Sequence, residues 1–297
     1  MSDPIVFVLD VAPADAAEPA AGWASTVHRV ERGTPILEGT DLGATRGDGV
    51  FETLGVLSGL PQAISGHFWR LARSAELLEL PAPNLEQWLV AMRMAAAALP
   101  SDRQGGVKLA LSRGIEGSGQ PSGWLVATEA EGDFPERTSG IRVATLDRGY
   151  SSDLSERAPW LLPGAKTLSY AVNMAALREA RRRGAQNAIF VSSDGYVMEA
   201  PQSTVLLRRG NTLITPKIDI GILPGTTQMS AFAVAEEWGL ETVDRLVPVS
   251  ELHDSDGVWI LSSVALATPI TAVDELPIAV DHEFSGRLNA ALISRRE

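Results

Sequence analysis

The sequence predicts an α/β protein of two domains. The chain has 297 residues, which is long enough for two domains or for one large α/β domain. Runs whose apolar residues have the spacing of strands alternate with runs that have the spacing of helices. A polar stretch at residues 129–140, with Pro135 and two glycines, separates two such series. We therefore expect a smaller N-terminal α/β domain at residues 1–132, a linker at 133–140 and a larger C-terminal domain at 141–297.

The N-terminal domain is expected to contain five strands and two helices. Residues 11–22 are rich in Ala, Pro, Asp and Glu, which predicts a mobile loop or an expanded hairpin. Ser65 is a plausible N-cap for a helix whose apolar residues recur at helical spacing. Strands are predicted at residues 5–9, 23–30, 47–56, 106–112 and 124–128, and helices at 65–80 and 84–99.

The C-terminal domain is expected to be larger and also mixed. Short apolar and β-branched runs predict its strands, and apolar residues at helical spacing predict its helices. Strands are predicted at residues 141–146, 188–191, 196–199, 204–207, 212–215 and 258–261, and helices at 167–183, 226–238 and 284–293.

Composition excludes several classes of function. The chain has no cysteine, which excludes disulfides, thiolate nucleophiles and Cys-ligated metal sites, and we predict no metal site. The formal net charge is -12, which argues against nucleic acid or an anionic membrane as the partner. No apolar run approaches the ~20 residues that a membrane span needs. Acidic residues interrupt the N-terminus where a signal peptide would be apolar, so we expect a cytoplasmic protein.

Lys166 is the first candidate for chemistry. The chain has only three lysines, Lys108, Lys166 and Lys217, and uses arginine for its other basic residues. Arginine cannot deprotonate in a protein and attack a carbonyl, whereas lysine can. A lysine among small and apolar residues is therefore a candidate for Schiff-base chemistry. The alternative is a lysine whose stem lies on apolar surface and whose amine reaches water.

A second candidate is an anion site at the start of the helix predicted at 226–238. Gly225 precedes the hydroxyls of Thr226 and Thr227, and a helix N-terminus attracts anions through its N–H groups and its dipole. Ser263, after a strand, would add a hydroxyl, and Arg70 a positive charge. The alternative is an ordinary N-cap. The sequence lacks the nucleotide-binding phosphate loop and the dinucleotide fingerprint, so we expect a phosphate that belongs to another ligand.

Glu199 is the third candidate, because it ends a predicted strand between apolar residues. An unpaired buried carboxylate costs several kcal/mol, so Glu199 needs a partner. A lysine, a phosphate site and a buried carboxylate are the parts that pyridoxal 5'-phosphate requires. The lysine would form the imine, and the carboxylate would keep the ring nitrogen protonated.

Five motifs in this order resemble the fold-type IV pyridoxal-phosphate enzymes. The motifs are Gly47-Asp-Gly-Val-Phe-Glu-Thr53, His67-x-x-Arg70-Leu71, Lys166, Glu199 and Leu223-Pro-Gly-Thr-Thr227, and the resemblance covers residues 40–272. It implies two α/β domains of the D-amino-acid aminotransferase type, with the cofactor at the domain interface, and a homodimer that acts on a small-molecule amino substrate. By position, the resemblance assigns the imine to Lys166, the ring nitrogen to Glu199, the phosphate to Arg70, Thr226, Thr227 and Ser263, and the ring to Leu223, Tyr170 and Ser203.

Within this family the sequence is most similar to aminodeoxychorismate lyases. Residues 107–114 resemble their Lys-x-x-x-Ser-Arg-Gly strand, and residues 166–179 resemble their lysine helix. Branched-chain aminotransferases have a Gly-Asn pair before the tyrosine that is absent before Tyr170. D-amino-acid aminotransferases have a tyrosine at the position of Phe51. We therefore predict a 4-amino-4-deoxychorismate lyase, with Phe51 and Arg113 near the substrate. The alternatives are an aminotransferase of D-amino or branched-chain amino acids and, more remotely, a non-catalytic dimeric binding protein.

Overall fold

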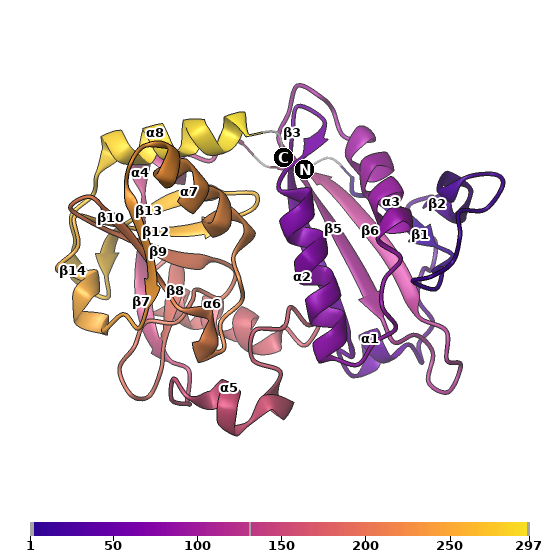
Figure 1. Ribbon diagram of the computed structural model, residues 1–297, viewed down its shortest axis with the longest axis horizontal. Coiled ribbons are helices and arrows are strands. Elements are labelled where there is room, and N and C mark those ends of the chain that lie inside the picture. The colour runs from indigo at the N-terminus through magenta and orange to yellow at the C-terminus, as the bar shows by residue number, and fades with distance from the viewer. Residues whose placement is uncertain (1–2, 131, 296–297) are drawn as a thin grey trace. The chain divides into compact units, whose positions relative to one another are not determined.

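The computed structural model describes residues 3–130 and 132–295, which form two compact units (Figure 1). The first unit contains residues 3–130 and 165–170, and the second contains residues 132–164 and 171–295. The chain thus returns to the first unit for a short segment that carries Lys166. The sequence placed this segment in the C-terminal domain, and the structure differs because the segment pairs with a strand of the first unit.

The first unit is built on a six-stranded sheet with the strand order β2-β1-β6-β5-β3-β4, in which all pairs are antiparallel. The strands are β1 (Ile5–Leu9), β2 (Val27–Val30), β3 (Gly49–Leu57), β4 (Leu60–Pro61), β5 (Gly105–Ser112) and β6 (Ser122–Glu129). The helices are α1 (Leu42–Thr45), α2 (Ile64–Leu77) and α3 (Leu85–Ala97), with a 3-10 turn η1 (Trp23–Thr26).

The strand register decides which residues of this sheet face the helices. Glu52 of β3 pairs with Leu109 of β5, which pairs with Leu125 of β6. These three residues therefore project from the same face, since side chains directly opposite each other share a face. Glu52 bonds to residues of α2, which places α2 on this face. Phe51 is one residue away and projects from the opposite face.

Two expectations for the first unit need correction, and a third agrees with the structure. Helix α2 begins at Ile64 after an N-cap at Ala63, so Ser65 is not the N-cap. The run predicted as one strand at 23–30 starts as the 3-10 turn η1 and becomes strand β2 only at Val27. The loop at residues 11–22 connects two antiparallel strands, as expected of an expanded hairpin. Asn84, the N-cap of α3, donates to the carbonyls of Pro13 and Ala16 in this loop.

The second unit contains a larger sheet with the order β11-β10-β9-β12-β13-β7-β8, and β14 pairs with β13. The strands are β7 (Ile141–Asp147), β8 (Asn187–Val191), β9 (Thr204–Arg209), β10 (Thr212–Pro216), β11 (Glu241–Arg245), β12 (Gly257–Ser262), β13 (Leu266–Val273) and β14 (Leu276–Pro277). The helices are α4 (Glu136–Ser139), α5 (Leu154–Arg157), α6 (Ala171–Arg182), α7 (Thr226–Glu237) and α8 (His282–Ser294), with 3-10 turns η2 (Pro159–Leu161), η3 (Ile218–Ile220) and η4 (Val249–Leu252).

The sequence missed strands β11, β13 and β14, and it misplaced two other segments. Helix α6 was expected from residue 167 but begins at Ala171. Residues 196–199 were expected to form a strand, but Tyr196 and Val197 make only isolated bridges, to Pro248 and Val191. In both segments, contacts with residues distant in the sequence decide the backbone conformation, and a local pattern carries no signal of them.

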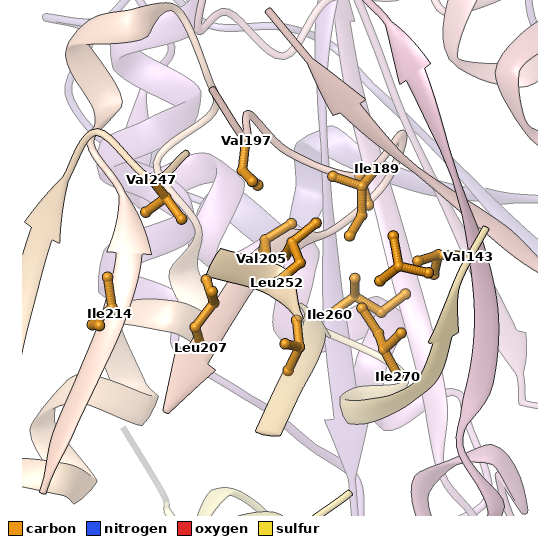
Figure 2. Packing of buried hydrophobic residues seen from close by; sticks show 13 residues of the cluster. Val143, Ile189, Val197, Val205, Leu207, Ile214, Val247, Leu252, Ile260 and Ile270 are labelled. Atoms are coloured by element: carbon orange, nitrogen blue, oxygen red, sulfur yellow. The ribbon is translucent and has the colours of Figure 1, made fainter. Parts of the chain in front are cut away.

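The sheet of the second unit is packed on both faces. On one face, Leu206 and Trp259 pack against helices α7 and α8. The other face contributes Val205 and Ile260 to a second apolar cluster, which also contains Val247 and Leu252 from the connection after β11 (Figure 2). Neighbouring residues such as Val205 and Leu206 alternate between the two clusters, as a strand buried on both faces requires. This core holds the ends of β9 and β12 in place, where the candidate site residues of this unit lie.

Within residues 3–130 and 132–295, no helix has both the length and the apolar character needed to cross a membrane.

Candidate active site

The backbone of Lys166 is held as an additional extended segment beside strand β3. The amide of Phe51 donates to the carbonyl of Lys166 at 3.0 Å, and the amide of Leu168 donates to the carbonyl of Gly49 at 2.8 Å. Thr167 and Val50 form an antiparallel bridge between these two bonds. The amide of Lys166 donates to the hydroxyl of a helix α2 residue, Ser74, at 3.1 Å. Strand β3 and helix α2 therefore fix the position of Lys166 together.

Two glycines of the Gly-Asp-Gly motif allow this close approach. Gly47 has a φ of 68°, and a Cβ at this position would lie 3.0 Å from the backbone of Ser169. At Gly49, a Cβ would lie 2.7 Å from the side chain of Leu168. Any side chain at these positions would push the lysine segment away from β3. The motif is thus more than the plain turn that its sequence alone would allow.

The side chain of Lys166 lies between two aromatic rings. Its Nζ is 4.5 Å from the ring centroid of Phe51 and 5.8 Å from that of Tyr170. The two rings pack edge to face, with their centroids 5.2 Å apart. Phe51 is buried, and its ring also lies 5.5 Å from the Nζ of Lys108. The structure therefore brings together three residues that the sequence assigned to the site, namely Lys166, Phe51 and Tyr170.

Arg70 is part of a buried ionic cluster on the other face of the same sheet. Its Nε donates to Oε1 of Glu52 at 2.6 Å, and its Nη2 donates to Oε2 at 2.7 Å. His67, one helical turn earlier on α2, lies with its Nδ1 2.7 Å from Oε2. All three side chains are almost completely buried. A carboxylate can only accept, so the ring of His67 donates from Nδ1.

The cluster is arranged to keep Glu52 ionised. Burial by itself raises the pKa of this carboxyl, but the charge and hydrogen bonds of Arg70, followed by those of His67, lower it to about 2. For His67, burial lowers the pKa, Glu52 raises it, and the charges of Arg70 and Lys166 lower it further, so the net shift is downward. His67 is therefore neutral at pH 7, and the charges of Glu52 and Arg70 balance each other. Arg70 can offer hydrogen bonds to a phosphate, but its formal charge is already paired.

Arg113 has a structural environment that was not expected for a substrate residue. Its Nε donates to Asp48 at 2.6 Å, and Asp48 raises the pKa of Arg113. The same guanidinium donates to the carbonyls of Leu78 and Glu79, just after the end of helix α2. Arg113 thus ties the motif before β3 to the end of α2. Its proposed contact with substrate stays a prediction, and these bonds weigh against it.

In the second unit, Glu199 and Leu223 are direct neighbours. The amide of Leu223 donates to Oε2 of Glu199 at 3.0 Å. The carbonyl of Glu199 accepts from the amide of Phe190, and Asn173 of α6 donates to the carbonyl of Pro201 at 2.6 Å. Glu199 is half-buried between the buried residues Met198 and Ala200. The first of these bonds orients the carboxylate of Glu199, and the other two hold the backbone around it.

Two of the three hydroxyls predicted to hold a phosphate, those of Thr226 and Ser263, lie close together near the start of helix α7. Oγ1 of Thr226 is 3.5 Å from Oγ of Ser263. Thr226 and Thr227 are buried in the first turn, and among the described residues no side chain caps this helix. Ser203 lies in a tight turn with Ala200, next to Glu199. The second unit therefore brings the predicted hydroxyl groups together at a helix N-terminus, where an anion is favoured.

Gly225, the N-cap of α7, is required by packing rather than by its backbone angles. Its φ is -79°, which any residue adopts, but an added Cβ would collide with Oγ1 of Thr204 and lie 3.0 Å from Cβ of Thr204. Thr204 is buried at the start of β9. The helix N-terminus is thus packed directly on the first residue of β9, an interior strand of the sheet.

We expect Gly225→Ala to lower stability by about 1–3 kcal/mol, the usual cost of overpacking, and to weaken cofactor binding at least tenfold because the first turn of α7 must shift. Urea unfolding and cofactor titration measure the two effects. Gly286→Ala is the matched control, because Gly286 lies in helix α8 with no atom within 4 Å of an added Cβ. Equal behaviour of the two variants would contradict the role given to Gly225.

The residues of the second unit fit pyridoxal 5'-phosphate. Buried hydroxyls at a helix N-terminus are suitable donors for its phosphate, and Glu199 is a suitable acceptor for its protonated ring nitrogen. The amide of Leu223 orients Glu199, and Leu223 lies only three positions before Thr226 in the chain. In the first unit, Lys166 carries an amine beside the ring of Phe51, which is the type of group that attaches this cofactor.

Sequence reasoning overlooked Glu52 and His67 as the residues that hold the candidate Arg70. Both stand in quoted motifs, but neither was given a role. The available signal was Glu52 itself, a carboxylate between Phe51 and Thr53 in an apolar strand buried on its helix face. Such a residue needs a cation or several donors, and His67-x-x-Arg70 supplies them from one face of a helix.

Comparisons with known proteins agree with this geometry. The family model described as amino-transferase class IV matches residues 49–273. A curated relative from Mycobacterium tuberculosis, named bifunctional aminodeoxychorismate lyase / D-amino acid transaminase, is 41% identical over 90% of this chain and 97% of its own length.

Two solved structures share the whole fold. A fold IV-transaminase from Curtobacterium pusillum superposes with a TM-score of 0.92 at 46% identity, covering 98% of both chains. A hypothetical aminotransferase from Mycobacterium tuberculosis in its PLP-bound form has a TM-score of 0.88 at 38% identity, covering 98% of this chain and 99% of its own. The predicted fold class is thereby confirmed.

Proposed function

This chain belongs to the amino-transferase class IV family, and from that premise we propose that it is a 4-amino-4-deoxychorismate lyase with a second, transaminase activity toward D-amino acids. The family uses pyridoxal 5'-phosphate, so the chain is an enzyme that depends on this cofactor and acts as a lyase or an aminotransferase. The observation that carries the finer proposal is the 41% identity, over almost the full length of both proteins, with a relative named for both activities.

The proposal assigns the cofactor contacts residue by residue. Thr226, Thr227 and Ser263 would hold the phosphate, with hydrogen bonds added by Arg70. Glu199 would face the ring nitrogen, and Leu223, Tyr170 and Ser203 would line the ring. That Lys166 and Glu199 serve the same cofactor is part of the proposal. It is supported by the order of their motifs, which the family shares, and by the hydrogen bond that aims Glu199.

In this assignment Lys166 moves the proton. When bound, pyridoxal phosphate supplies an electron sink for the carbon that carries the substrate's amine. Lys166 would remove the proton from that carbon as a general base, a role that contributes typically 10²–10⁴-fold to a rate. The rings of Phe51 and Tyr170 lie near its Nζ, where they limit the directions in which the amine can move.

The lyase reaction then needs no other reactant. After proton removal, the bond between the ring carbon and the enolpyruvyl oxygen breaks, and the leaving group takes the electron pair. It gains one proton to become pyruvate, while the six-membered ring becomes aromatic as 4-aminobenzoate. Atoms balance without water, and aromatisation makes the reaction downhill. A transaminase shares the first proton removal, which explains how one set of residues can serve both activities.

Paired assays on the purified holoenzyme test this proposal. With 4-amino-4-deoxychorismate alone we expect 4-aminobenzoate and pyruvate in equal amounts. With D-alanine and 2-oxoglutarate we expect slower formation of glutamate, and with L-leucine and 2-oxoglutarate none. 4-Aminobenzoate is the diagnostic product, because pyruvate also arises from D-alanine. Transamination without release of 4-aminobenzoate would reject the lyase assignment, and turnover of L-leucine would favour the branched-chain alternative.

A homodimer and a cytoplasmic location are also proposed. The first rests on the family resemblance, and the second on the composition, since a chain without cysteine suits a reducing compartment.

A further inference from the structure

The hydroxyl of Ser263 lies in the turn that joins strands β12 and β13. Ser262 and Leu266 are the last paired residues of these strands, so the turn consists of the three residues between them. Leu266 has a φ of 58°, a left-handed conformation that costs a non-glycine residue about 1–2 kcal/mol. A turn with this strain needs contacts that hold it, and two of them are visible.

One contact is internal to the turn, and the other comes from Arg137. The amide of Ala265 donates to the hydroxyl of Ser262 at 3.3 Å. From helix α4, Arg137 donates through Nε to the carbonyl of Ala265 at 2.8 Å and through Nη2 to the carbonyl of Val264 at 2.7 Å. A single planar guanidinium therefore binds two successive carbonyls of the turn.

Arg137 is itself held firmly. Its guanidinium carbon lies 4.2 Å from the ring centroid of Phe134, and helix α4 packs against β13 and α8. The side chain is half-buried. Burial lowers the pKa of Arg137 and neighbouring Glu136 raises it, but a guanidinium keeps its charge at neutral pH. The guanidinium of Arg137 is thus held against the backbone of the β12–β13 turn.

These bonds determine how the turn faces helix α7. The carbonyl and N–H of one peptide group point in opposite directions, since the group is planar and trans. Holding the carbonyls of Val264 and Ala265 fixes the peptide planes between Val264 and Ala265 and between Ala265 and Leu266, which begin one residue after Ser263. Ser263 then has little freedom to move its hydroxyl away from Thr226, which lies 3.5 Å from it.

We propose that Arg137 is a positioning residue for the cofactor phosphate: by binding the carbonyls of Val264 and Ala265 it holds Ser263 beside the first turn of α7. It also places a positive charge behind the two peptide groups, which favours an anion on their other side. The inference rests on the proposed function only in taking Ser263 and Thr226 as phosphate ligands. It gives residues 133–140, expected to be a linker, an indirect part in cofactor binding, through Ser263.

The test compares the affinity of the apoenzyme for pyridoxal 5'-phosphate and for pyridoxal, which lacks the phosphate. If Arg137 acts on the phosphate site, its loss should weaken the binding of pyridoxal 5'-phosphate and leave the binding of pyridoxal unchanged. For Arg137→Gln we expect the preference for the phosphorylated form to fall about tenfold, in line with hydrogen bonds to charged groups, while pyridoxal binding stays within about twofold. Arg137→Lys keeps the charge and part of the bonding, so its preference should fall less.

Arg208→Gln is the matched control. Arg208 also stacks on an aromatic ring, 4.7 Å from the centroid of Phe284, and also donates to a backbone carbonyl, that of Gly210 at 3.1 Å. We expect this variant to lose stability without losing the preference for the phosphorylated form. The double variant Arg137→Gln with Ser263→Ala should lose less than the sum of the single losses, because both act on the same contact.

Each result bears on the inference. Equal weakening of both ligands by Arg137→Gln, or no weakening, would overturn it. A preference that falls in Ser263→Ala but survives in Arg137→Gln overturns the role of Arg137 alone. A preference that survives in both variants overturns the phosphate assignment of the turn and the inference with it. If Arg137→Gln does not fold, the same preference is measured in Arg137→Lys and Ser263→Ala. A preference that falls in Ser263→Ala but not in Arg137→Lys would then overturn the role of the Arg137 hydrogen bonds.

Discussion

Replacing Lys166 with alanine is expected to remove both turnover and the visible absorption of the holoenzyme. The chain has only two other lysines, and Lys166 alone is held between β3, α2 and the rings of Phe51 and Tyr170. Loss of a positioned general base costs about 10²–10⁴-fold in rate, and loss of the attachment point adds to this. Both the lyase and the transaminase activity should fall together, since they share the proton removal.

The few lysines make this prediction easy to check. Lys217→Ala is the control, because Lys217 pairs with Asp219 at 3.1 Å in the second unit and has no assigned role. It should keep the wild-type rate and spectrum. Borohydride reduction of the wild-type holoenzyme, followed by peptide mass analysis, should place the cofactor on Lys166. Cofactor mass on another lysine, or full activity in Lys166→Ala, would refute the assignment.

The second large effect is expected at Glu52. Glu52→Gln keeps the shape of the side chain but removes its charge, which breaks the ion pair of Glu52 with the buried guanidinium of Arg70. Breaking a buried ion pair in this way costs about 3–5 kcal/mol. We therefore expect a large loss in the free energy of unfolding, and weaker cofactor binding because Arg70 loses its fixed orientation.

The pH dependence of stability provides a second readout at the same position. The pKa of Glu52 is lowered from 4.5 to about 2 in the folded protein. A carboxyl with a lowered folded pKa contributes stability above its unfolded pKa and loses it as the pH falls through the folded value. The contribution of Glu52, about 3 kcal/mol by linkage, should therefore be complete above pH 4.5 and disappear progressively toward pH 2.

Urea unfolding of both proteins between pH 2 and pH 7 measures this effect. The wild type should lose more stability than Glu52→Gln over the acid range, so that the two curves converge at low pH. Glu129→Gln is the control, because Glu129 belongs to the same sheet and pairs with the exposed Arg103 at 3.3 Å. An exposed pair contributes only about 0–1 kcal/mol. Parallel curves for the wild type and Glu52→Gln would contradict the proposed ionisation of Glu52.

The sequence by itself determined the chemistry and most of the regular elements. Residue type is decisive at Lys166, since only lysine among the basic residues can act as an amine nucleophile, and the order of motifs identified the family. Helices with strong periodicity were located well: the helix predicted at 226–238 is α7 at Thr226–Glu237. These features depend on residues near one another in the chain, which a pattern can report.

Only the tertiary structure decided how the site is held. The segment after Lys166 has a helical pattern, yet it runs extended because the edge of β3, more than 100 positions earlier, offers it backbone partners. The partners of Glu52 come from helix α2, and those of the Ser263 turn come from Arg137, more than 120 positions away. Each of these bonds joins segments that are distant in sequence. Their position depends on how strands and helices pack, and no local pattern of residues encodes that.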